Sequence, residues 1–218
     1  MRFPGLAFLG LLIVLCVGAS TPAVQAGDLD GVEAEFEKAI RKVSPATVVV
    51  VPRVKQRPGL SLSSSSGVIV SSKGLVLSDR DAGTYYSQKK GEKKRERFVT
   101  DDIEIRIPDL RGRGFRSYDA QVVLRQPDLD TSLIKIEDPK GALPFVTVGD
   151  SDALRVGDFA FAMGNSFGLA AEAPPTLTAG LIASLVPFET VGDGRYEWIY
   201  TSAAVNQGVN GGPLVDVE

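Results

Sequence analysis

The sequence contains no histidine among its 218 residues, and its single cysteine is Cys16. Without histidine the chain has no imidazole, which is the side chain best suited to act as a general base near neutral pH. A single cysteine excludes an internal disulfide, and we expect no thiolate metal site. The hydrophobic core must therefore stabilise the fold, and a hydrophobic content of 44% is typical of globular proteins.

The N-terminus has the pattern of a signal peptide. Arg2 precedes the apolar run 6–17, which includes Cys16, and the small residues of 23–26 follow it before Gly27. We predict cleavage after Ala26, so that residues 1–26 are removed and 27–218 form the mature chain. An uncleaved membrane anchor is disfavoured, because the run is shorter than the ~20 apolar residues that cross a bilayer. Both interpretations predict export to the periplasm or the extracellular space, as in a bacterial envelope.

The charge balance does not indicate a nucleic-acid partner. The chain has 24 basic and 27 acidic residues, a net charge of −3. A local basic cluster is interrupted by Glu92 and Glu96, and we interpret it as a solvated loop rather than as a site for a phosphate-rich or acidic partner. The cluster consists of Lys89, Lys90, Lys93, Lys94, Arg95 and Arg97.

One helix is expected after the signal peptide. Asp30 is a candidate N-cap, Glu33 is placed as in a capping box, and Pro45 ends the helix. An apolar stripe predicts that one face packs on the domain. The stripe consists of Val32, Phe36, Ile40 and Val43.

The remaining sequence predicts an all-β protein. Short apolar and β-branched segments alternate with turns, without intervening helices, which fits a sandwich or a barrel. The serine-rich stretch 61–66 and the segment 85–100 are expected to be loops. The expected strands are 47–51, 67–70, 75–77, 103–107, 120–124, 133–136, 145–148, 159–163, 176–183, 198–201 and 213–217.

The most specific motif is the segment 207–213, Gln-Gly-Val-Asn-Gly-Gly-Pro. Its glycines permit a tight turn in which two backbone N–H groups converge on one point, as in an oxyanion hole. An ordinary glycine turn between strands is the alternative. Trypsin-like serine proteases place their nucleophile in Gly-x-Ser-Gly-Gly-Pro, and Asn210 stands where that serine belongs. The nearby Tyr196, Trp198 and Tyr200 are expected in the core rather than in a cleft.

Four further segments, in the same order, resemble the HtrA (DegP-like) family of envelope proteases. They are 66–78, 130–136, 150–158 and 164–169. The resemblance implies an all-β, trypsin-like fold of two packed six-stranded barrels with an N-terminal helix. The chain stops at Glu218, after an apolar segment, so we expect the C-terminal barrel to be incomplete and no PDZ domain to follow.

The resemblance also assigns the catalytic positions. Asp130 matches the family's aspartate, Asp81 falls where its histidine is expected, and Asn210 falls where its serine is expected. The backbone amides of Gly208 and Asn210 match the oxyanion hole. An asparagine amide cannot form an acyl-enzyme, and an aspartate near its usual pKa is a weak general base. The sequence therefore predicts a catalytically degenerate homologue, a pseudoprotease, that uses no cofactor or metal.

The resemblance brings Asp81 close to Asp130, and three interpretations of this pair stay open. The two carboxylates perform acid chemistry, they bind a hard cation, or each pairs with a basic residue such as Arg80. We favour the third, because two acidic residues alone are a weak signal for a metal or a catalytic site.

The predicted function is binding of unfolded or extended peptides, or of an envelope protein, at the former substrate cleft. A homo-oligomer or a hetero-oligomer is compatible with this role, and contact with a membrane is expected only through an uncleaved signal. The alternative is a hydrolase or endopeptidase with carboxylate or metal chemistry. A third possibility is that the chain is a fragment of a longer product.

Overall fold

The computed structural model describes residues 26–55, 60–88, 93–109, 114–167, 174–189 and 195–216. The predicted signal peptide, residues 1–26, lies outside these ranges except for Ala26. Within them, no helix combines the length and the apolar character needed to cross a lipid bilayer.

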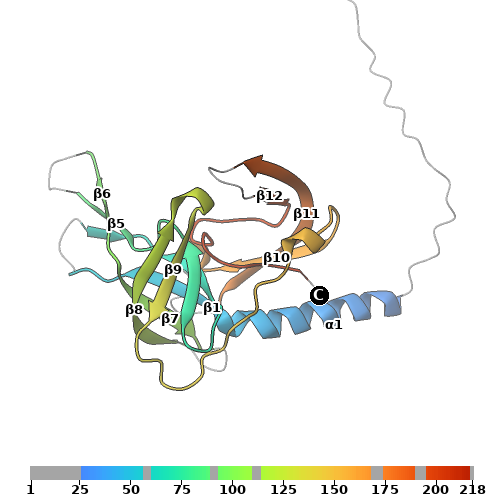
Figure 1. The fold of residues 1–218 in the computed structure, drawn as a ribbon. Coiled ribbons are helices and arrows are strands. Elements are labelled where there is room, and N and C mark those ends of the chain that lie inside the picture. Colours follow the sequence, from blue (N-terminus) through green and yellow to red (C-terminus); the bar gives the residue numbers. More distant parts are fainter. Residues whose placement is uncertain are drawn as a thin grey trace, which may run out of the picture.

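Residues 47–136 contain a closed six-stranded barrel in the order β1-β3-β4-β9-β8-β7, in which every strand pairs antiparallel with its neighbours (Figure 1). Alternate side chains point inward, and β-branched residues suit this half-buried surface. The largest fully buried barrel residues are Val48, Val50, Ile69, Val76, Ile103, Ile105, Ile107, Ile134 and Ile136. The strands are β1 (Thr47–Pro52), β3 (Ser65–Ile69), β4 (Leu75–Asp79), β7 (Asp102–Pro108), β8 (Phe115–Gln126) and β9 (Thr131–Ile136).

Two smaller sheets flank the barrel. A four-stranded sheet has the order β12-β11-β10-β13 and is open within the described residues. A three-stranded sheet has the order β2-β5-β6 and projects beyond the barrel (Figure 1). The all-β prediction with one complete barrel is confirmed. The strands are β2 (Leu60–Leu62), β5 (Thr84–Ser87), β6 (Glu96–Val99), β10 (Phe159–Gly164), β11 (Thr176–Glu189), β12 (Arg195–Thr201) and β13 (Leu214–Val215).

The helix α1 spans Ala26–Val43, and a 3₁₀ turn, Ser44–Ala46, links it to β1. It begins four residues before Asp30, so the predicted cap is wrong, because the helical backbone already includes Asp30. The packed face is as predicted, since the Phe36 ring makes edge-to-face contacts with Phe159 and Phe161 of β10 at 5.3 and 4.7 Å.

Four local predictions are wrong. The stretch 61–66 and the segment 85–100 were both expected to be loops, but the first contributes to β2 and β3 and the second to β5 and β6. The segment 145–148 is not a strand; the Val146 N–H donates to the Ile69 carbonyl, but no ladder forms. Trp198 and Tyr200 are exposed on β12 rather than buried. Periodicity detects apolar segments, but pairing partners decide whether they become strands.

Candidate functional site

The glycine turn predicted from residues 207–213 is held against the first barrel by Ser66 of β3. The Ser66 N–H donates to the Asn210 carbonyl at 2.8 Å, and its hydroxyl donates to the Gly208 carbonyl at 2.7 Å. The same hydroxyl accepts from the Asn165 N–H at 2.8 Å. Ser66 is fully buried, so its hydroxyl and N–H tie the glycine turn to β3 from inside the fold.

The turn has the backbone shape that its glycines permit. Gly208 and Gly211 have φ angles of +96° and +82°, a region that residues with a side chain rarely adopt. The Gly208 and Asn210 N–H groups donate to no carbonyl or side chain among the described residues. Both predicted oxyanion-hole donors therefore remain available to a ligand.

Arg80 lies between the two predicted acidic positions. Its Nε is 3.8 Å from the Asp81 carboxylate and 3.3 Å from the Asp130 carboxylate. Asp81 also accepts a hydrogen bond from Arg97 of β6 at 2.6 Å. These contacts agree with the third interpretation of the acidic pair, in which each carboxylate is neutralised by arginine.

The segment that carries Asp81 is fixed from β8. Arg125 donates from Nη1 to the carbonyls of Arg80 and Ala82 at 2.6 and 2.9 Å. Its Nη2 donates to the Asp101 carboxylate at 2.9 Å. One guanidinium therefore holds the backbone on both sides of Asp81 in the turn after β4.

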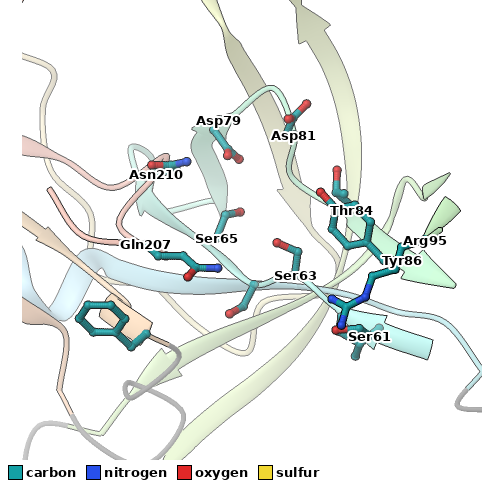
Figure 2. Close-up of a pocket in the computed structure, with 14 residues that line it drawn as sticks. Ser61, Ser63, Ser65, Asp79, Asp81, Thr84, Tyr86, Arg95, Gln207 and Asn210 are labelled. Atoms are coloured by element: carbon teal, nitrogen blue, oxygen red, sulfur yellow. The ribbon is translucent and has the colours of Figure 1, made fainter. Parts of the chain in front are cut away.

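An open cavity of about 620 Å³ lies beside the glycine turn (Figure 2). Hydroxyl, amide and charged side chains dominate its lining, which favours a polar ligand. Gly208, Asn210 and Asp81 all contribute, whereas Asp130 lines a neighbouring cavity that also contains Asp79, Asp81 and Asn210. The structure thus gathers the four predicted positions around two adjoining hollows.

Asp79, at the end of β4, is a site residue that the sequence analysis missed. It lines both cavities, and Figure 2 shows it between Asn210 and Asp81. Burial raises the pKa of Asp79, the charges of Asp81 and Asp130 add to the rise, and contacts with Ser65 and Ser78 oppose it. The available signal was the acidic pair Asp79 and Asp81 at the predicted histidine position.

Replacing Asp79 by asparagine should stabilise the fold at pH 7. Above its raised pKa the folded state carries an unfavourable buried charge, which asparagine lacks. The free energy of unfolding should increase by less than about 1 kcal/mol, because the Asp79 carboxyl is partly exposed to water. This increase should shrink as the pH falls through the raised pKa and vanish below 3.8, the ordinary value. Guanidinium unfolding of Asp79→Asn and of the unaltered protein, from pH 7 to pH 4, measures the difference between their free energies of unfolding. A difference that grows on acidification contradicts the raised pKa of Asp79.

Comparison with family models gives a match to the trypsin-like peptidase domain over residues 65–218. The periplasmic serine endoprotease DegP of Escherichia coli is 40% identical over 102 residues, 47% of this chain and 20% of that protein. A probable DegP-like periplasmic serine endoprotease of Chlamydia muridarum is 32% identical over 174 residues, 77% of this chain and 28% of that protein. The matched region thus spans between a fifth and just over a quarter of these relatives.

A solved structure shares the fold. The HtrA-type protease AlgW, in complex with a tripeptide, superposes with a TM-score of 0.62 at 28% identity. The superposition covers 84% of this chain and 50% of AlgW. The resemblance predicted from the sequence motifs is therefore confirmed by the sequence comparison and by the fold.

Proposed function

Since the chain belongs to the trypsin-like peptidase family, among the HtrA/DegP-like proteases, we propose that it is an exported, catalytically degenerate member that binds extended peptides. The observation that carries the proposal is the amide side chain of Asn210, at the nucleophile position of the glycine turn. The Gly208 and Asn210 N–H groups of this turn meet no acceptor among the residues that the structure describes. Export is supported by the periplasmic relatives and by the signal-peptide pattern.

The chemistry of the three positions supports loss of catalysis. The Asn210 amide has no hydroxyl that could attack a peptide carbonyl. The chain contains no histidine at any position, so no imidazole can take up a proton. Asp81, at the expected histidine position, accepts a hydrogen bond from Arg97 and carries no imidazole that could activate a nucleophile.

The shape of the site supports peptide binding. Gly208 and Asn210 line a polar cavity, and their N–H groups, without an acceptor among the described residues, can donate to a peptide carbonyl or carboxylate. Ser61 and Leu62 of β2 line the same cavity, and β2 has only β5 as a partner among the described strands. An extended peptide can add to such an edge through main-chain hydrogen bonds. AlgW, which shares the fold, was solved with a tripeptide.

Peptide binding should depend on the shape of the glycine turn. In Gly208→Ala the new Cβ would overlap the Asn165 carbonyl oxygen and displace the turn. We expect the affinity for fluorescently labelled, denatured casein to fall at least about 10-fold, the loss expected when about 1.4 kcal/mol of hydrogen bonding is removed. Fluorescence anisotropy measures this affinity.

The matched control is Gly157→Ala, because Gly157 also has a positive φ, +104°, but its Cβ would meet no atom within 4 Å. It should bind casein as the unaltered protein does, and circular dichroism checks that both variants are folded. Equal affinity of Gly208→Ala and Gly157→Ala would remove the glycine turn from the proposed binding site.

A further inference from the structure

We propose that Asp79 and Ser65 form a subsite for a primary ammonium group of the bound peptide, either a lysine side chain or a free N-terminus. The subsite deepens the proposed peptide-binding function and rests on it. It lies where β3 begins and β4 ends, next to Asn210 (Figure 2).

Asp79 is the acidic residue of the site that lacks a basic partner. Nearby arginines are engaged elsewhere: Arg80 pairs with Asp81 and Asp130, and Arg97 pairs with Asp81. No lysine or arginine among the described residues lies within ion-pair distance of the Asp79 carboxylate. Within the described part of the chain, its carboxylate accepts only a long hydrogen bond of 3.4 Å from the Ser78 hydroxyl.

Ser65 provides an independent observation. Its side chain is 8% exposed, it lines the cavity, and its hydroxyl is the buried side-chain group without a hydrogen-bond partner among the described residues. The hydroxyl lies close enough to Asp79 to oppose the rise in that residue's pKa, yet no bond of good geometry joins them. An unpaired buried hydroxyl costs stability, and a ligand that bonds to it recovers that cost.

The charge distribution selects the sign of the ligand group. Burial and the charges of Asp81 and Asp130 disfavour the ionised form of Asp79, and a cation beside it would offset these effects. Arg95, which lines the same cavity, lies at its far end with Ser61 and Tyr86 (Figure 2). The Asp79 end therefore attracts a positive group and the Arg95 end does not.

The donors and acceptors favour an ammonium. The Asp79 carboxylate and the Ser65 hydroxyl oxygen offer several acceptor sites in a small space, and an ammonium supplies three N–H donors that rotate to meet them. Among the described residues, no group of three or more acidic side chains is placed to hold a metal ion. A compact organic cation therefore fits the arrangement.

The test uses an array of 12-residue peptides that tile β-casein, each made with lysine and with acetyllysine, and each with a free and an acetylated N-terminus. The labelled full chain is applied at pH 7 as the unaltered protein, as Asp79→Asn and as Asp152→Asn. Asp152 is exposed and lines neither cavity at the site, so its variant controls for the loss of one negative charge. Asp79→Asn is expected to be folded, because it removes a buried charge.

For the unaltered protein and Asp152→Asn, we expect binding to fall about 5- to 10-fold when the recognised ammonium is acetylated. For Asp79→Asn, the same acetylation should change binding less than 2-fold. The lysine and N-terminal arms identify which amine is recognised. An equal loss in Asp79→Asn would overturn the subsite, whereas failure of every peptide to bind to any of the proteins would overturn the proposed function itself.

Discussion

Replacing Gly211 by alanine is expected to destabilise the protein by roughly 3–5 kcal/mol, enough to unfold many domains. Gly211 has a φ angle of +82°, and an added Cβ would lie 2.5 Å from the Asp79 N and inside contact distance of the Ser66 carbonyl oxygen. Both are backbone atoms of strands in the barrel, so neither can move without disturbing the sheet. Guanidinium unfolding at pH 7 measures the loss.

Gly141→Ala separates the clash from the cost of the backbone conformation. Gly141 has a φ angle of +90°, but a Cβ there would meet no atom within 4 Å. Its variant should lose only about 1 kcal/mol, the usual cost of placing alanine at a positive φ. If Gly211→Ala loses no more than Gly141→Ala, the glycine turn does not pack against the barrel as described.

Restoring the residues that the family resemblance implies should restore hydrolysis only when Arg80 is also replaced. In the double variant Asp81→His/Asn210→Ser, the new imidazole needs the Asp130 carboxylate to orient it. Arg80 lies 3.3 Å from that carboxylate and competes for it. We expect the triple variant, with Arg80→Asn added, to cleave denatured casein at least about 10-fold faster than the double variant. In Ser-His-Asp proteases, loss of the orienting aspartate lowers kcat by up to about 10⁴-fold.

The control for this comparison is Arg155→Asn in the double-variant background, because Arg155 is an exposed arginine that lines neither cavity at the site. It should leave the activity of the double variant unchanged. Equal rates for the double and triple variants would contradict interference by Arg80. A folded but inactive triple variant would show that the scaffold has lost more than the side chains at these positions.

Local sequence patterns were sufficient for the barrel and for the positions of the site. Alternating β-branched residues such as Val48 and Val50 mark strands whose inward faces fill the core. All six barrel strands were expected, and only β8 begins well before its predicted start. The glycine turn and Asp81 were located because their motifs are short and continuous in sequence. A motif of this kind can be recognised without knowing which distant residues it contacts.

The features that were missed depend on contacts between distant segments. β5 and β6 form because each finds a partner, which a polar and charged sequence does not reveal. Arg97 was assigned to a solvated basic cluster, but pairing of β6 with β5 brings it to Asp81. Asp79 and Ser65 lie in different predicted elements, and their unusual environment arises only when β3 and β4 meet the glycine turn. Burial and electrostatics, which set these properties, are tertiary effects.

The central claim is that the unaltered chain binds peptides without cleaving them. The most direct measurement is release of acid-soluble fragments from denatured, labelled casein by the purified chain at pH 7, beside its Asn210→Ala variant and a buffer blank. We expect all three to release fragments at the same background rate. Release by the unaltered chain above the blank, abolished in Asn210→Ala, would contradict the claim and assign a catalytic role to the Asn210 position.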